Sequence, residues 1–258
     1  MKYPSFYINQ DIQKSMNIFK YNEKVQFPLK KLSVAMGNFD GLHLGHRSVI
    51  DLARPRETFG KFGVLTFDPH PREFFAPNLE PFRLMSKTAK EIGLEKLGLD
   101  VLLEVPFTEE VSLLEPNSFV KKILCDYFDL VHVVVGQDFK FGYQRKGTAH
   151  ILKKLCNSCG IKVTIAPLVK NNLLEISSTA IREALKNGDP KRAADMLGDY
   201  YSIIGTVIQG DKRGRTLGYP TINLELSKLH LPKFGVYSAV VNILSGNKIG
   251  TYSAAVSI

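Results

Sequence analysis

The sequence predicts an α/β fold with a doubly wound parallel sheet, followed by a smaller antiparallel β domain. Buried-strand patterns alternate with helical patterns through the first two-thirds of the 258 residues. This alternation is typical of βαβ units, in which a crossover helix returns the chain to a parallel strand. After Tyr200 the pattern changes to short β-type runs separated by Gly, Pro, Asn and Asp, which is typical of an antiparallel barrel or sandwich.

The same patterns give the expected elements and domains. Ser86 and Pro116 suit the first positions of two helices. Gly188 and Gly198 bracket a short linker helix, so we expect a first domain over 1–187, a linker over 188–199 and a β domain over 200–258. Strands are expected over 32–36, 62–67, 101–105, 131–136 and 162–167, with β-type runs over 201–208, 221–224, 236–244 and 250–256. Helices are expected over 46–52, 87–97, 116–127, 148–155, 178–187 and 190–197.

Composition narrows the class of partner. The net charge of +9 is spread along the chain, which favours phosphorylated small molecules over nucleic acid. The sequence has no apolar run that approaches the roughly 20 residues of a membrane span, and its start lacks the layout of a signal peptide. Three cysteines do not make a disulfide scaffold in a chain of this size, so a cytoplasmic location is expected.

A glycine-rich turn follows the first predicted strand. It reads Gly37-Asn38-Phe39-Asp40-Gly41-Leu42-His43-Leu44-Gly45-His46 and leads into a helix. A strand, a glycine-rich turn and a helix start point backbone N–H groups at a bound phosphate. His43 and His46 lie on one face of this helix start and can donate to phosphates, while Gly45 lets a ligand approach the backbone. A structural histidine pair or a fragment of a metal site is the alternative, although a metal site needs further ligands with suitable spacing.

Two loops after later strands carry candidate ligand contacts. In Thr66–Phe75, two prolines fix the turn around His70, and Phe74 offers a flat surface on which a planar heterocycle can stack. In Gly136–Gly142, Asp138 can hydrogen-bond a base, a ribose or another ring. Phe75 offers a similar surface. The alternatives are that Phe74 and Phe75 are both core residues and that the second loop is an ordinary polar turn.

The segment Ile176–Arg182 has the pattern of a second phosphate-binding helix start. Ser177 or Ser178 caps the helix, and Arg182 follows Ser178 by one turn on the same face. A guanidinium can grip a phosphate through two hydrogen bonds. Taken alone, the segment also fits an ordinary Ser-capped helix with a solvated arginine. Two phosphate-type segments in one domain, however, fit a triphosphate.

A glycine-rich basic loop stands out in the β domain. Gly210 and Gly214 allow a loop that wraps phosphates, and Lys212 and Arg215 supply positive charge. Thr221 and Asn223 follow, and their oxygens suit Mg²⁺. A glycine-rich β-hairpin is the alternative and explains the glycines, though not the whole set.

Taken together, these motifs resemble the bacterial bifunctional riboflavin kinase/FMN adenylyltransferases, also called FAD synthetases. The resemblance spans nearly the whole chain, and Ser-Ser-Thr-x-x-Arg together with Pro-Thr-x-Asn makes it specific. It implies a nucleotidyltransferase domain that transfers AMP from ATP to FMN, giving FAD and pyrophosphate, and a flavokinase-like domain that phosphorylates riboflavin. Mg²⁺ is the implied cofactor, and ATP, FMN and riboflavin are the implied substrates.

The resemblance also implies a role for each motif residue. The implied catalytic residues are His43, His46 and Arg182. The implied ATP-binding residues are Gly37, Asn38, Phe39, Asp40, Gly45, Ser177, Ser178 and Thr179. The implied flavin-binding residues are His70, Pro71, Phe74 and Asp138. In the kinase module the implied phosphate and Mg²⁺ residues are Gly210, Lys212, Gly214, Arg215, Thr221 and Asn223, the last two being the metal ligands.

Two departures from the family pattern matter. The stretch between His46 and Thr66 is shorter than usual and is interrupted by Pro55. The sequence stops at Ile258, before the further strands and the general-base glutamate of the family's kinase module. We therefore expect an incomplete barrel and poor phosphorylation of riboflavin. The alternative functions are another small-molecule nucleotidyltransferase and a non-catalytic flavin- or nucleotide-binding remnant.

Overall fold

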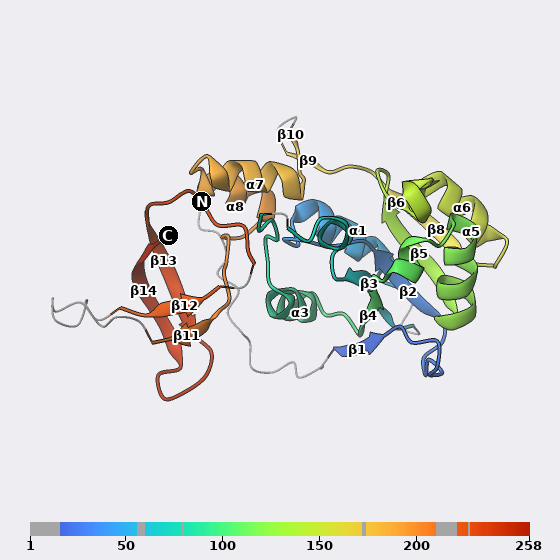
Figure 1. Ribbon diagram of the computed structural model, residues 1–258, viewed down its shortest axis with the longest axis horizontal. Helices are drawn as coiled ribbons and strands as arrows, with labels where there is room; N and C mark the ends of the chain where they lie inside the picture. The colour runs from blue at the N-terminus through green and yellow to red at the C-terminus, as the bar shows by residue number, and fades with distance from the viewer. Residues whose placement is uncertain (1–15, 56–59, 79, 172–173, 210–220, 227) are drawn as a thin grey trace.

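A six-stranded parallel sheet forms the centre of the molecule. The computed structural model describes residues 16–55, 60–78, 80–171, 174–209, 221–226 and 228–258. The strand order is β1-β4-β3-β2-β5-β8, and all neighbouring pairs are parallel (Figure 1). From β2 the chain winds outward to β3 and β4 on one side and to β5 and β8 on the other. The doubly wound parallel sheet is therefore confirmed, and its switch point lies beside β2.

The five longer strands lie close to their predicted positions because each is mostly apolar. Parallel strands buried on both faces are typically continuous hydrophobic runs. These strands are β2 (Leu32–Met36), β3 (Phe62–Asp68), β4 (Val101–Pro106), β5 (Leu130–Gly136) and β8 (Lys162–Ala166). The edge strand β1 (Asn17–Lys20) was not predicted. It is short and mostly exposed, and its two apolar residues stand side by side, so it shows neither a long apolar run nor a clear alternation.

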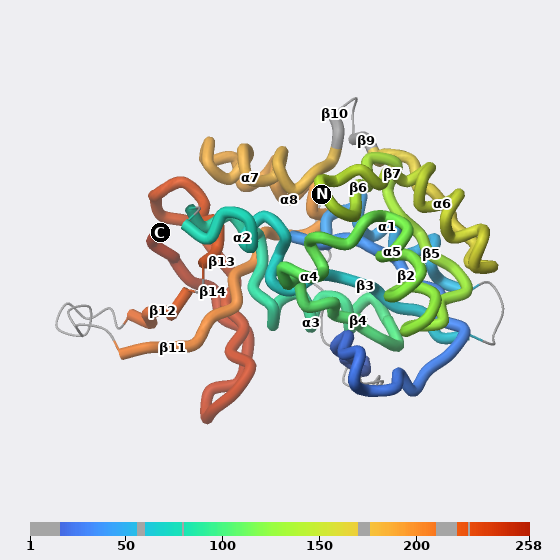
Figure 2. The backbone as a smooth tube through the Cα atoms, turned by 45° about the vertical axis from the view of Figure 1, so that its right-hand side comes forward, coloured from blue at the N-terminus to red at the C-terminus, as the bar shows by residue number. Residues whose placement is uncertain are grey.

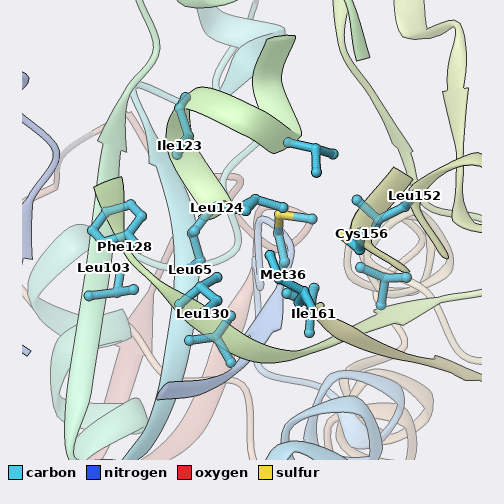
Figure 3. Packing of buried hydrophobic residues seen from close by; sticks show 14 of the residues in the cluster. Met36, Leu65, Leu103, Ile123, Leu124, Phe128, Leu130, Leu152, Cys156 and Ile161 are labelled. Carbon is cyan, nitrogen blue, oxygen red and sulfur yellow. The ribbon is translucent and has the colours of Figure 1, made fainter. Parts of the chain in front are cut away.

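Helices cover both faces of the sheet. Helices α1 (Leu44–Ala53) and α3 (Lys87–Lys96) pack on the face that carries Ala35 and Val64. Helices α5 (Pro116–Phe119), η1 (Val120–Tyr127), which continues α5 with π-type hydrogen bonding, and α6 (Ala149–Asn157) cover the other face. Figure 3 shows the core of this second face, where Met36 and Leu65 lie beneath Leu124. Ser86 and Pro116 occupy the predicted helix-start positions.

Short elements fill the connections at the ends of the strands. These are α2 (Pro71–Phe75), α4 (Glu109–Ser112), the pair β6 (Lys140–Phe141) and β7 (Gly147–Thr148), η2 (Tyr143–Arg145), and the pair β9 (Lys170–Asn171) and β10 (Leu174–Glu175). None was predicted, because segments of two to five residues are too short to show a periodic pattern.

Helices α7 (Ser178–Lys186) and α8 (Pro190–Leu197) pack against each other next to the sheet domain. The buried face of α8 shares a cluster with Ile181, Leu185 and Leu84. The expected linker helix is therefore a packed helix, which ends at Gly198 with a positive φ of 70°. Only a residue that tolerates the left-handed region ends a helix in this way without strain.

The C-terminal part forms antiparallel sheets, as predicted. In the described residues its four strands make two separate pairs, β11 (Thr206–Ile208) with β12 (Asn223–Glu225), and β13 (Val236–Ile243) with β14 (Gly250–Ser257). Figures 1 and 2 show both pairs to one side of the parallel sheet, below α7 and α8. Leu229 bridges to Arg83, and the His230 imidazole contacts the Arg182 carbonyl oxygen at 3.1 Å, which joins this part to α7.

Candidate active site

The glycine-rich turn lies at the carboxyl end of β2, where ligands of doubly wound sheets bind. His43 caps α1, because its Nδ1 accepts the backbone N–H of His46 at 3.2 Å. This acceptor role places the proton of the neutral His43 ring on Nε2, which is then available as a donor. The two imidazoles stack with centroids 3.5 Å apart and planes 19° apart.

Two polar atoms of this turn are buried without a hydrogen-bond partner in the described part of the chain: Asn38 Oδ1 and His46 Nδ1. Buried polar atoms in folded proteins are almost always paired, and exceptions are concentrated where a ligand or water binds. Phe39 packs edge-on against His46, with ring centroids 5.3 Å apart. Both unpaired atoms belong to residues that the sequence assigned to nucleotide binding or catalysis.

Gly45 has protein atoms close to the position that a Cβ would take. A Cβ at this position would lie 3.2 Å from the His43 ring and 3.5 Å from the Ile176 carbonyl oxygen. The space beside Gly45 is therefore filled by protein atoms. The glycine allows His43 to lie flat and lets the chain preceding α7 approach α1.

Asp40 joins the turn to the second phosphate-type segment. Its backbone carbonyl accepts the Ser178 hydroxyl at 2.7 Å, and its Oδ2 accepts an N–H of Arg182 at 3.0 Å. Its Oδ1 accepts the backbone N–H of Leu84 at 2.8 Å. Two segments separated by 138 residues in the sequence thus meet in one site. Asp40 and the Ser178 hydroxyl are engaged within the protein, whereas the sequence pattern had suggested ligand contacts for both.

The start of α7 carries the remaining predicted phosphate contacts. Ser177 caps the helix, its hydroxyl accepting the backbone N–H of Ala180 at 3.2 Å. Thr179 is exposed, and its hydroxyl accepts an N–H of Arg182 at 3.3 Å. The guanidinium of Arg182 also donates to the Phe82 carbonyl at 3.3 Å, so it is held in place from three sides.

The loop after β3 reaches the same region. His70 caps α2, its Nδ1 accepting the Arg72 N–H at 3.0 Å, and its ring packs edge-on against Phe82 at 5.0 Å. Arg182 and Arg72 both lie over Phe82, with guanidinium carbons 5.6 and 4.8 Å from the ring centroid. His70, Arg72 and Arg182 therefore meet at one buried ring, Phe82, a connection that the sequence pattern did not indicate.

Phe74 lies in an aromatic group at the surface. It packs edge-on against Phe75 and Phe107, with both centroid distances 5.3 Å, and Phe75 is 67% exposed. The alternative that both residues belong to the core is wrong. An apolar group at the carboxyl edge of the sheet is a surface on which a planar ring can stack.

Asp138 occupies an exposed turn after β5, in which the Phe139 N–H donates to the Gly136 carbonyl at 3.1 Å. Phe141 is buried in the core beneath this turn. Because β3 and β5 flank β2 in the sheet, the turns that carry His70 and Asp138 border the glycine-rich turn on its two sides. The position fits either a ligand contact or the alternative of an ordinary polar turn.

The predicted kinase residues are only partly described. Gly210, Lys212, Gly214 and Arg215 lie outside the described residues. Thr221 is exposed, and Asn223 opens β12 opposite Ile208 in β11. Among the described residues, no three His, Cys, Asp or Glu side chains gather in a way that could hold a metal ion.

Burial keeps the imidazoles of the site neutral. It lowers the pKa of His43 to about 4, with smaller contributions from the charges of Arg182 and Arg47. It lowers the pKa of His46 well below its ordinary value, helped by His43 and Lys90. It also lowers the pKa of His70 to about 4. Near neutral pH all three rings can therefore donate or accept single hydrogen bonds without carrying charge.

These shifts predict a loss of stability in mild acid. The folded pKa values lie below the unfolded value of about 6.5, so the unfolded chain binds protons more readily. The contribution of these neutral imidazoles to the free energy of unfolding is complete above pH 6.5. It is lost as the pH falls toward 4, and each histidine loses about 1.4 kcal/mol per unit of difference between its unfolded and folded pKa. Urea unfolding at several pH values measures it. His70→Asn keeps a good cap and removes one titration, so its profile should be flatter; identical profiles would contradict the assignment.

Comparisons with known proteins agree with this fold. A parallel α/β sheet with paired imidazoles at its switch point defines a nucleotidyltransferase-like protein. The sequence profile described as FAD synthetase matches residues 26–180, and the profile described as riboflavin kinase matches residues 197–258. The chain therefore belongs to the FAD synthetase family.

Curated relatives are named bifunctional riboflavin kinase/FMN adenylyltransferase. The protein from Buchnera aphidicola is 39% identical over 211 residues, which cover 81% of this chain and 67% of that protein. The protein from Haemophilus influenzae is 37% identical and the one from Escherichia coli K12 34% identical, each covering 84% of this chain and, respectively, 71% and 70% of the relative.

A solved structure shares the fold. It is described as a macrolide-efflux protein from Streptococcus pneumoniae, and it matches with a TM-score of 0.80 and 30% identity over 94% of this chain and 79% of that one. Within the part of our chain that is described, the helices are too short or too polar to traverse a bilayer.

Proposed function

We propose that this chain makes FAD by transferring the AMP unit of ATP to the phosphate of FMN, with release of pyrophosphate. The observation that carries the proposal is the joining of two phosphate-type helix starts, at His43–His46 and Ser177–Arg182, through Asp40. Helix N-termini offer free N–H groups and a positive dipole end to anions. Two of them at one site suit a triphosphate, and the family membership identifies the flavin as acceptor.

The reaction needs little proton transfer. One oxygen of the FMN phosphate attacks the α-phosphorus of ATP, a new P–O bond forms, and the bond to the bridging oxygen of the β-phosphate breaks. The electron pair of that bond leaves with pyrophosphate. The attacking phosphate has a second pKa of about 6 and is already ionised at neutral pH, so a protein base is unnecessary. Catalysis then rests on positioning and on stabilising charge in the transition state.

We assign the transferring phosphate to the two imidazoles. His43 presents Nε2–H because its Nδ1 accepts the His46 N–H. His46 adds a buried ring whose Nδ1 has no partner among the described residues. Thr179 and Arg182, held at the start of α7, are assigned to the leaving β- and γ-phosphates. Gly37, Asn38 and Phe39 form the turn on which the nucleotide lies.

The flavin is assigned to the loops on either side of the turn. His70, Pro71 and Phe74 follow β3, and Asp138 follows β5. Because these strands flank β2, a flavin between their loops would bring its phosphate towards the imidazole pair. The exposed aromatic group around Phe74 supports stacking of the flavin ring.

We propose that Mg²⁺ enters as a complex with ATP. Mg²⁺ in nucleotide sites is usually held by substrate phosphates with one or two protein carboxylates and water. In the kinase part, Thr221 and Asn223 remain the proposed oxygen ligands. The riboflavin kinase profile over residues 197–258 supports phosphorylation of riboflavin as the second activity of the chain.

The test is incubation of the purified chain with Mg²⁺ and ATP and either FMN or riboflavin, followed by chromatography of the flavins. The FMN arm measures adenylyl transfer alone, and we expect FAD to accumulate. The riboflavin arm measures phosphorylation, with FMN and FAD as products. A chain that binds ATP and FMN and forms no FAD would be the non-catalytic remnant, and a product formed only with another phosphate acceptor would favour a different nucleotidyltransferase.

Arg182→Lys should raise the KM for ATP by about 10-fold, which corresponds to about 1.4 kcal/mol of lost binding. Lysine keeps the charge and loses the planar group that contacts Asp40, Phe82 and Thr179 together. Initial rates at varied ATP concentration measure the effect. Arg192→Lys on the neighbouring α8 is the control, since its side chain is exposed. Equal ATP dependence in both variants would remove Arg182 from the site.

A further inference from the structure

Lys90 reaches from α3 into the glycine-rich turn. Its Nζ donates to the Asn38 carbonyl at 2.9 Å, although the two residues are 52 positions apart. The side chain is partly buried beneath the turn. From the sequence, α3 was predicted only as a helix over 87–97 between two strands. The spacing of Lys87 and Lys90, which places both on one helix face, was the signal that could have drawn attention to them.

The two lysines have different surroundings. The ammonium of Lys87 makes ion pairs with Asp68 at 3.2 Å and Glu104 at 2.8 Å. For Lys90, by contrast, no carboxylate among the described residues lies within ion-pair distance. Asp40, Asp68 and Glu104 attract its charge from farther away, and Arg83 repels it. A partly buried cation without a close counter-ion is costly, and a bound anion would offset that cost.

Lys90 contacts one of the two residues that carry an unpartnered buried polar atom, and its charge acts on the other. Asn38, whose carbonyl Lys90 holds, carries one of the two unpartnered buried atoms, and His46 carries the other. An ammonium has three N–H donors, and the Asn38 carbonyl accounts for one. Positive charge and free donors thus lie beside the imidazole assigned to the transferring phosphate.

We propose that Lys90 is a phosphate-binding residue of this site, which fixes the glycine-rich turn with one N–H and offers its charge to the phosphates of ATP. The proposal rests on the proposed FAD-forming function. It extends that function to a helix outside the motifs that the sequence identified. Burial and the charge of Arg83 lower the pKa of Lys90, and the charge of Lys90 in turn helps lower the pKa of His46 and His70.

The test compares Lys90→Met, Lys90→Arg and the control Lys96→Met, which changes an exposed lysine of the same helix. We expect Lys90→Met to lower kcat/KM for ATP by about 100-fold, the effect typical of losing one preorganised electrostatic contact. Lys90→Arg should recover at least a tenth of the lost rate because it restores charge and a donor. Thermal unfolding of Lys90→Met should match the wild type, since methionine fills the same space without a buried charge.

Calorimetric titration with Mg²⁺ and ATP separates this proposal from the proposed function, because it needs no turnover. Weaker ATP binding in Lys90→Met, with normal binding in Lys96→Met, supports the proposal even if no acceptor yields FAD. Failure of the wild type to form FAD counts against the function alone. Unchanged ATP affinity together with kcat/KM within about twofold of the wild type would overturn the role of Lys90, as would equal losses in the Met and Arg variants.

Discussion

Replacing His46 with alanine should lower kcat for FAD formation by about 10²–10³-fold while the chain stays folded. The ring stacks on His43 at 3.5 Å and has a buried nitrogen without a partner in the described chain. A contact that strengthens as charge develops on the transferring phosphate affects kcat more than KM. Steady-state rates at saturating ATP and FMN, with circular dichroism of the same samples, measure the effect.

A matched control is His150→Ala. His150 is an exposed histidine on α6, a helix outside the glycine-rich turn and far from it in the sequence. Its removal should leave kcat unchanged. His46→Gln should retain part of the activity if its amide donates to the same phosphate oxygen. Wild-type turnover in His46→Ala would place His46 among the structural histidines, which is the alternative that the His-x-Gly-His spacing alone leaves open.

Replacing Asp40 with alanine should have the largest effect on stability, a loss of about 3–5 kcal/mol in the free energy of unfolding. The side chains of Asp40 and Arg182 are 8% and 15% exposed, so removal of the carboxylate leaves a buried guanidinium without its counter-ion. The Leu84 N–H loses its acceptor as well. Because Asp40 also joins α7 to the turn, ATP binding should weaken in parallel.

The control for this variant is Asp51→Ala. Asp51 pairs with Arg54 at 3.7 Å on the surface, with side chains 66% and 47% exposed, and such pairs contribute about 0–1 kcal/mol. Urea unfolding followed by circular dichroism gives both values from the midpoint and slope. Similar small losses in the two variants would show that the buried pair does not hold the two segments together.

The architecture could be predicted from the sequence where a pattern is long and apolar. Mostly apolar runs such as Val101–Val105 have few alternatives to a buried parallel strand. Ser86 and Pro116 favour the start of a helix through local chemistry that needs no tertiary context. Antiparallel strands after Tyr200 were predicted because short β-type runs alternate there with turn residues. The edge strand β1 was missed because its own residues carry no strand pattern. It is a strand because it pairs with β4.

The individual residues of the site could be predicted from the sequence, but the contacts between distant segments could not. The motifs identified His43, His46 and Ser177, whose capping bonds are local. They did not show that Asp40 joins two distant segments, because that role depends on contacts across 138 and 142 residues. Lys90 was missed for the same reason, since only the packing of α3 brings its ammonium to Asn38.

Transfer of the α-phosphate of ATP to the flavin tests the central claim most directly. The purified chain is incubated with Mg²⁺, unlabelled FMN and ATP labelled either in the α-phosphate or in the γ-phosphate, and the flavins and phosphates are separated. We predict that the α-label appears in FAD and the γ-label in pyrophosphate, and that His46→Ala loses both signals together. An α-label that remains in ATP, ADP or AMP, with no labelled FAD, would contradict adenylyl transfer by this site.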